Sequence, residues 1–100
     1  MESKWKIRIE APALRELRAL LESEGNRAYY AILDDILALE DDPLPKGCIR
    51  LRKTKDFYRI YAHGAKCRII DRVLTSSRKI LIERVRPRPT AYSGLDRWGD

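Results

Sequence analysis

Arginine and tyrosine are concentrated near the C-terminal end of the sequence, in the segment "RVRPRPTAY" from Arg84 to Tyr92. Because side chains alternate along an extended chain, Arg84, Arg86 and Arg88 are expected to point the same way. The two prolines of this segment lack the backbone donor that a further strand would need for pairing. The segment therefore predicts a row of guanidinium groups at the end of a strand, followed by the phenol of Tyr92.

These two residue types suit the chemistry of phosphate esters. A guanidinium, with a pKa above about 12, is a poor base, but it binds phosphate through two parallel hydrogen bonds and stabilises the charge of a pentacoordinate phosphorus. A tyrosine, with an ordinary pKa of about 10, becomes a better proton acceptor when neighbouring cations lower that pKa. Metal-free RNA cleavage needs both functions, so the segment is chemically suited to it.

Other kinds of site have little support. His63 is the single histidine and falls in an expected turn, and the two cysteines, Cys48 and Cys67, lack metal-ligand spacing and are too few for a disulfide scaffold. The scattered glycines form no phosphate-binding or dinucleotide-binding motif. We expect no metal, no cofactor and free thiols.

Charge is distributed unevenly along the chain. The net charge is +6, but residues 1–43 sum to −4 and residues 44–100 sum to +10. An acidic front half and a basic back half are typical of a domain that presents one face to a polyanion. A well-solvated surface that is merely rich in lysine and arginine explains the composition equally well.

The hydrophobic pattern predicts one α+β domain spanning residues 1–100, with a C-terminal tail at 93–100 that contains Trp98. Alternation predicts an N-terminal strand, and two helical stripes predict a hairpin, with Leu14 facing inward and Asn26 capping the second helix. Four short alternating segments then predict an antiparallel meander, with both helices on one sheet face and the arginines on the other, solvated face. The expected strands are 5–10, 47–53, 56–62, 66–74 and 78–86, and the expected helices are 11–25 and 27–42. The N-terminus shows neither a signal peptide nor a membrane span, so a cytoplasmic protein is expected.

The order of these elements and several short motifs resemble the RelE/ParE superfamily of bacterial and archaeal toxins. The resemblance runs from Trp5 to Tyr92. It rests on the passage "DDPLPKGCIRL", on "FYRIY" and "CRIID", and on the final "RVRPRPTAY". It implies the fold β-α-α-β-β-β-β and a toxin of a type II toxin–antitoxin system that cleaves mRNA in the ribosomal A site and so inhibits translation.

The resemblance also implies roles for individual residues. Arg59 would help bind the reacting hydroxyl and Arg68 would clamp the scissile phosphate. Arg88 would support the leaving-group side, and Tyr92 would act as the base or as a stacking platform. The sequence departs from the usual family pattern at Asp71, where an aromatic residue is common. It also departs at Tyr61, where a second basic residue is frequent, and at Pro87, where a histidine or lysine is frequent. The residues expected to contact RNA or the ribosome are Lys53, Lys55, Tyr61, Arg84 and Arg86.

Three functions remain open at this point. The favoured one is the ribosome-dependent endoribonuclease, with mRNA, the ribosome and a cognate antitoxin protein as partners. The second is a ParE-like inhibitor of DNA gyrase that has no nuclease activity. The third is a non-enzymatic RNA-binding module, since fold does not determine function and tyrosines on a basic surface also suit base stacking.

Overall fold

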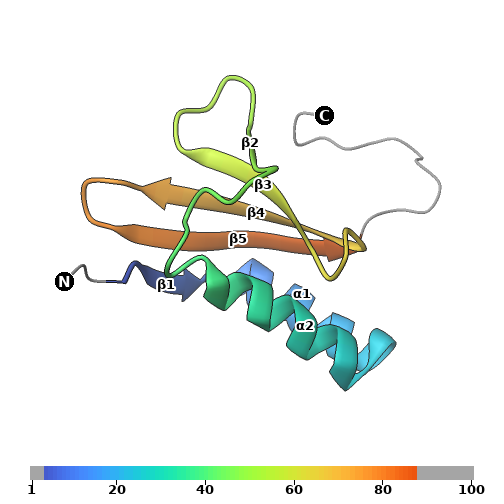
Figure 1. Ribbon diagram of the computed structural model, residues 1–100. Helices are drawn as coiled ribbons and strands as arrows, with labels where there is room; N and C mark the ends of the chain where they lie inside the picture. The colour runs from blue at the N-terminus through green and yellow to red at the C-terminus, as the bar shows by residue number, and fades with distance from the viewer. Residues whose placement is uncertain (1–3, 88–100) are drawn as a thin grey trace.

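The computed structural model describes residues 4–87, and Figure 1 shows how their elements are arranged. A first strand leads into a helical hairpin, after which four strands complete the chain. The elements in order are β1 (Lys6–Ile9), α1 (Ala11–Glu24), α2 (Asn26–Ala38), β2 (Ile49–Arg50), β3 (Phe57–Ala62), β4 (Cys67–Leu74) and β5 (Lys79–Pro87). The predicted fold class and element order are confirmed.

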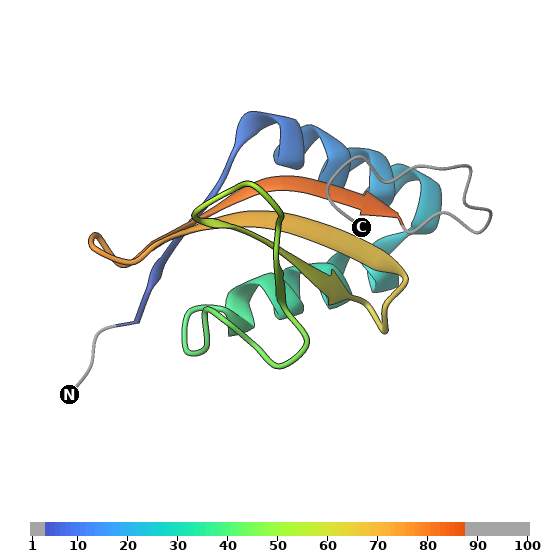
Figure 2. The same cartoon turned by 90° about the horizontal axis from the view of Figure 1, so that it is seen from above.

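The described strands form one five-stranded sheet in the order β1-β5-β4-β3-β2. The meander from β2 to β5 is antiparallel throughout, as short turns require. β1 pairs with β5 in parallel, because the helical hairpin carries the chain across to the far edge of the sheet before the meander begins. The N-terminal strand therefore lies beside the last strand (Figures 1 and 2).

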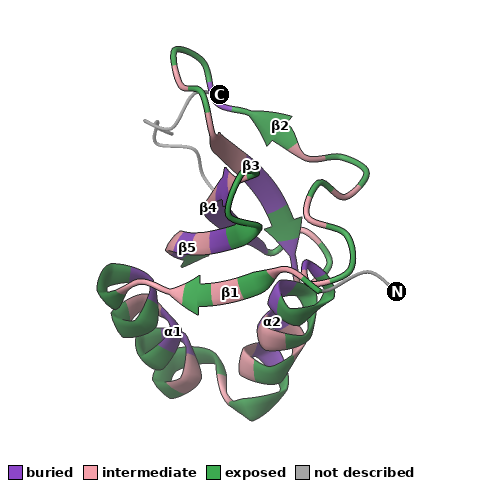
Figure 3. Cartoon of the chain, turned by 90° about the vertical axis from the view of Figure 1, so that its left-hand side faces the viewer, coloured by how far each residue is buried: buried purple, intermediate pink, exposed green. Residues whose placement is uncertain are grey.

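Both helices lie on the same side of the sheet, and their buried surfaces face each other and the strands (Figure 3). On α1, the residues Ala13, Leu17 and Leu20 repeat at the spacing of one helical face and are buried. Leu14, which the sequence predicts to face inward, is 37% exposed instead. The buried stripe of Ala13, Leu17 and Leu20 lies about 100° around the helix axis from Leu14, which is the rotation of one residue.

The helix ends also differ in detail from the prediction. Asn26 is the first residue of α2 and makes no capping hydrogen bond; the N-cap is Gly25, whose φ of 93° suits glycine. α2 ends at Ala38, four residues before the predicted end, and the chain passes through a turn before Pro43. The strand predicted at 47–53 is reduced to the two residues of β2.

β5 contains a bulge that changes which side chains face the helices. Ile82 pairs with Asp71 and Arg84 pairs with Ile70, so that Glu83 is an extra residue on β5. Before the bulge the even-numbered Ile80 and Ile82 belong to the core, and after it the odd-numbered Val85 does. The bulge therefore places Arg84 and Arg86 on the opposite side of the sheet from the core.

Candidate nucleic-acid interface

We call the side of the sheet opposite the helices the open face. Residues that are paired directly across neighbouring strands share a face, and Ile60, Ile69 and Val85 form a row that packs in the core on the helix side. The residues on either side of these in each strand therefore belong to the open face. They form two rows across the sheet, Tyr61–Arg68–Arg86 and Arg59–Ile70–Arg84.

Tyr61 contacts one arginine of β3 and one arginine of β4. The guanidinium carbon of Arg59 is 5.4 Å from the centre of the Tyr61 ring, and that of Arg68 is 5.7 Å from it. Both distances are within the range of a cation–π contact. Two predicted catalytic residues and one predicted RNA contact are thus brought together, and one aromatic ring touches both guanidinium groups.

The open face is less solvated than the sequence predicts. Arg59 and Arg68 are each only 8% exposed and Ile70 is 3% exposed, whereas Tyr61 is 38% exposed. A buried guanidinium has few accessible rotamers, so these two arginines are held in position before any ligand binds. The prediction of a wet sheet face is wrong for β4, which is largely buried on both sides.

A second arginine–aromatic contact extends the open face toward the other end of the sheet. Arg72 on β4 lies over the ring of Phe57 on β3, 5.5 Å from its centre, and the two residues are paired in register. The sequence reasoning missed both residues, although each follows the same two-residue alternation as Arg59 and Arg68. We refer to Arg59, Arg68, Arg72, Arg84 and Arg86 together as the arginine cluster.

Arg84 and Arg86 are predicted to contact RNA from a solvated sheet face, but in the structure both form ion pairs with a helix. The carboxylate of Glu16 on α1 accepts a hydrogen bond of 2.7 Å from Nη2 of Arg84 and one of 3.2 Å from Nε of Arg86. Burial acts to raise the pKa of Glu16, but hydrogen bonds from Arg84, from the Val85 backbone and from Arg86 outweigh it and hold that pKa below its usual value. The sequence reasoning did not identify Glu16.

The two predicted lysine contacts lie in the loop between β2 and β3. Lys53 and Lys55 are exposed, and Thr54 between them donates a hydrogen bond of 2.7 Å from its hydroxyl to the Leu51 carbonyl. Both lysines are therefore exposed on a turn that the Thr54 hydrogen bond stabilises. Arg88, Tyr92 and the tail at 93–100 lie outside the described residues, so their predicted roles stay predictions.

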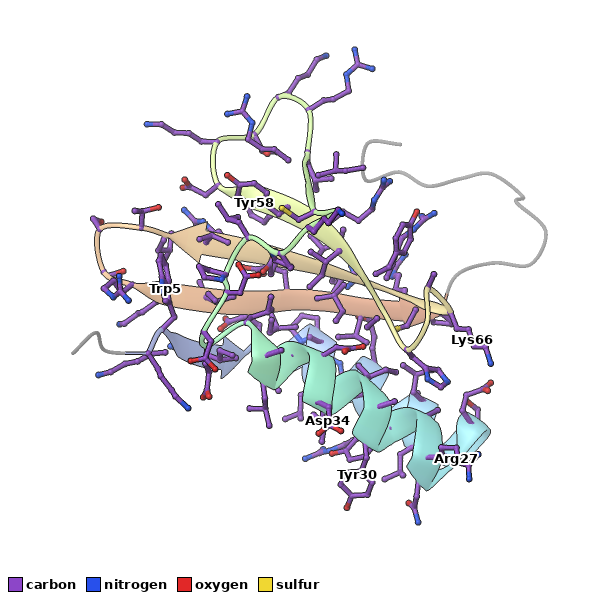
Figure 4. The ribbon with its side chains drawn as sticks, viewed as in Figure 1. Trp5, Arg27, Tyr30, Asp34, Tyr58 and Lys66 are labelled. Carbon is purple, nitrogen blue, oxygen red and sulfur yellow. The ribbon has the colours of Figure 1, made fainter. Side chains whose placement is uncertain are left out.

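The other side of the molecule has a different character. Arg27, Tyr30 and Asp34 project from α2 away from the sheet (Figure 4). Tyr30 is 59% exposed and Leu37 is 51% exposed. This helical surface carries charged side chains of both signs as well as apolar ones, and it lies on the other side of the sheet and the core from the open face.

Asp71 is a charged residue within the sheet that has no evident role on the open face. It is completely buried, and its carboxylate oxygens have no hydrogen-bond partner elsewhere among residues 4–87. Burial raises the pKa of Asp71 to about 7, opposed only by its own backbone N–H. Below that pH the side chain is predominantly a neutral acid inside the core.

No three or more histidine, cysteine, aspartate or glutamate side chains at 4–87 are grouped so that they could hold a metal ion. Neither described helix has the length and hydropathy needed to cross a membrane. Cys48 and Cys67 are free thiols.

Among known proteins, similarity to this chain is found in solved structures and not in sequence comparisons. No protein family model and no curated protein sequence matches the chain. Several solved structures do match. A RelE–RelB complex from Pyrococcus horikoshii is 26% identical, with a TM-score of 0.70 over 88% of this chain and 99% of that one. The toxin–antitoxin complex RelBE2 of Mycobacterium tuberculosis is 22% identical, with a TM-score of 0.69 over 85% and 99% of the two chains.

The isolated RelE toxin of Escherichia coli is similar as well. It is 16% identical, with a TM-score of 0.70 and 88% of each chain covered. The three matches span bacteria and an archaeon, and the P. horikoshii and M. tuberculosis chains are covered almost completely. The protein described here has the fold of the RelE toxins.

Proposed function

We propose that this protein is the toxin of a toxin–antitoxin pair and that it cleaves mRNA on the ribosome without a metal ion. The observation that carries the proposal is the contact of Arg59 and Arg68 with the ring of Tyr61 on the open face of a RelE-like fold. Guanidinium groups held in fixed positions are suited to a phosphate whose negative charge increases during the reaction.

The proposal assigns separate tasks to the residues of the open face. Arg68 clamps the scissile phosphate, and Arg59, one row away on the next strand, polarises the attacking hydroxyl. Arg59 and Arg68 are each only 8% exposed, so RNA must displace neighbouring side chains to reach their guanidinium groups. This requirement would restrict cleavage to RNA that is held firmly against the open face. A ribosome that presents the message in a defined path meets that requirement.

Arg88 and Tyr92 complete the proposed site. In the sequence Arg88 directly follows β5 and Tyr92 comes four residues later, and the last open-face row of β5 contains Arg68 and Arg86. In the proposed reaction the attacking 2′-oxygen forms a bond to phosphorus as its proton passes to the proton acceptor, and the bond from phosphorus to the 5′-oxygen breaks as that oxygen takes a proton from water. Tyr92 is the proposed proton acceptor, and Arg88 balances charge on the leaving side.

A partner is part of the proposal. The chains from P. horikoshii and M. tuberculosis belong to complexes of toxin and antitoxin. We propose a protein antitoxin with an acidic segment for this chain too, because the basic back half of the sequence, at +10, offers such a segment a complementary surface.

The direct test is to induce the gene in bacteria and to map mRNA ends by primer extension. The proposal predicts growth arrest with cuts inside translated codons, and no cuts when translation initiation on the reporter mRNA is blocked. The Arg59→Gln, Arg68→Gln double variant should express as a folded protein without cuts. Arrest with an SOS response and intact mRNA would indicate a gyrase inhibitor instead, and RNA binding without arrest would indicate a binding module.

A further inference from the structure

The edge of β5 ends its pairing with β1 halfway along. Ile9, the last residue of β1, pairs with Ile82, and the described residues provide no strand beside β5 beyond that point. The backbone N–H of Val85 nevertheless has a partner, since it donates a hydrogen bond of 2.8 Å to Oε1 of Glu16. The Glu16 carboxylate thus occupies the position that a strand carbonyl would otherwise hold.

The same carboxylate binds two members of the arginine cluster. Arg84 donates from Nε at 3.2 Å to both oxygens of Glu16 and from Nη2 at 2.7 Å to Oε2. Arg86 donates from Nε at 3.2 Å to Oε2. The Glu16 side chain is 22% exposed and that of Arg84 is 28% exposed, so salt screens this pair less than a fully exposed one.

This arrangement divides the arginine cluster into two groups. Arg59, Arg68 and Arg72 lie over aromatic rings on the open face. Arg84 and Arg86 start from the open face, but their guanidinium groups are drawn to the edge of the sheet by one negative charge on α1.

We propose that Glu16 is a positioning residue that withholds Arg84 and Arg86 from the RNA backbone and fixes the end of β5. RNA phosphates then engage Arg59 and Arg68, and the end of β5 is held against α1. This inference rests on the proposed action on RNA, but its test has two measurements that need no cleavage.

The first measurement is the salt dependence of binding to a fluorescent 20-nucleotide single-stranded RNA. Glu16→Gln keeps an amide oxygen for the Val85 N–H and removes the charge that holds both arginines. Each guanidinium that becomes a phosphate contact should steepen the slope of log K against log salt by about 0.7, so the variant should show a slope steeper by about 1.4. Glu22→Gln is the matched control, since Glu22 is an exposed residue on the same helix.

Removal of the two arginines completes the test. With Glu16 intact, the double substitution Arg84→Gln and Arg86→Gln should leave the salt slope nearly unchanged. In the Glu16→Gln background, the same double substitution should return the slope to the wild-type value. A slope in Glu16→Gln equal to that in Glu22→Gln overturns the inference. A large loss of slope in the arginine double variant with Glu16 intact overturns it as well.

The second measurement is hydrogen exchange at the arginine Nε–H groups by NMR in the absence of RNA. These protons of Arg84 and Arg86 should exchange slowly in the wild-type protein and much faster in Glu16→Gln. Fast exchange in the wild type overturns the inference even if the protein binds no RNA. Slow exchange and the expected slopes, together with intact mRNA during expression, would support the role of Glu16 and contradict the proposed nuclease.

In the cleavage assay Glu16→Gln should lower KM and kcat together. The freed arginines bind RNA more tightly, whereas the end of β5 keeps the Val85 hydrogen bond but loses the two ion pairs that hold it against α1. A variant that had merely lost stability would not bind its substrate more tightly.

Discussion

The two faces of the central sheet are built from neighbouring residues of the same strands, yet they have opposite character. Arg59 is followed by Ile60, and Arg68 by Ile69; the arginines lie on the open face and the isoleucines pack in the core. On the helix side, apolar side chains meet apolar side chains. On the open side, guanidinium groups lie over aromatic rings. The strand alternation that builds the core therefore also aligns the charged side chains.

The contrast is one of chemistry more than of burial. Arg59 and Arg68 are 8% exposed and Ile69 is fully buried, so exposure alone hardly separates the two faces. What differs is how burial of the side chain affects the free energy of folding. Burial of an isoleucine stabilises the fold, whereas burial of a guanidinium is costly unless it is paired. At Arg59 and Arg68 the ring of Tyr61 provides one such contact for each guanidinium.

The largest effects are expected from truncation on either side of β4. Ile69→Ala should lower the free energy of unfolding by about 2–5 kcal/mol, because it leaves a cavity in the core. Arg68→Ala should instead lower the rate of mRNA cleavage by about 10²–10³-fold through loss of charge stabilisation. Chemical denaturation and a cleavage assay on translating ribosomes measure the two effects. Arg68→Ala with full activity would remove the distinction between the faces.

A comparably large effect on stability is expected from Asp71, the acid buried within the sheet. Its pKa is raised from 3.8 to about 7 in the folded protein, so the folded state holds the proton more tightly than the unfolded chain does. The associated stability is fully present below about pH 4, is lost as the pH rises toward 7, and changes little above that. The loss should be about 4 kcal/mol, since the pKa rises by about three and one pKa unit corresponds to about 1.4 kcal/mol.

Denaturation curves between pH 4 and 8 would measure this loss, and Asp71→Asn should flatten them across that range. Glu16 contributes in the opposite sense, because its pKa is lowered on folding. Its stabilising effect is present above its ordinary pKa of 4.5 and is lost as the solution becomes more acidic. A pH profile that is unchanged in Asp71→Asn would show that Asp71 does not retain its proton in the fold.

A smaller effect is expected from Tyr61 and tests how the open face aligns its arginines. If the ring positions Arg59 and Arg68 through cation–π contacts, Tyr61→Phe should keep cleavage within about twofold, and Tyr61→Leu should lower it by about tenfold, which corresponds to about 1.4 kcal/mol. The two variants differ in aromaticity while both lack the hydroxyl. Equal losses in both would assign the effect to the hydroxyl and not to the ring.

The smallest effects are expected from the loop lysines. Lys53→Gln and Lys55→Gln should each reduce the salt dependence of ribosome binding by roughly one phosphate contact, or about 0.7 in slope. The cleavage rate at saturating ribosome concentration should not change. Filter binding at several salt concentrations would measure the slope, and Lys66→Gln, on the turn between β3 and β4, is a control of equal charge. A fall in the saturated rate would place the lysines in the reaction itself.

Much of the fold could be predicted because its signals are local. Alternation in β3 and the apolar stripes of both helices identified their elements, and the short turns between strands predicted the antiparallel meander. The weaker predictions were those that depend on partners. β2 is only two residues long because it pairs with β3 only over Ile49 and Arg50. The sequence pattern of this segment does not indicate where that pairing ends.

The chemical composition of the open face was readable from the sequence, since arginines at every second position of a strand must share a side. Three features were decided by the tertiary structure alone. Arg59 and Arg68 meet over Tyr61 only because β3 and β4 pair in one register. The bulge at Glu83 restores Arg84 and Arg86 to the open side, where strict alternation from Ile80 and Ile82 would have turned them into the core.

The third feature is the ion pair of Glu16 with Arg84, across 68 residues of sequence. Local patterns report the conformation of a segment, because backbone geometry sets which neighbours share a face. They do not report which distant side chain fills an unpaired strand edge. That depends on the packing of α1 against β5, and therefore on the whole core.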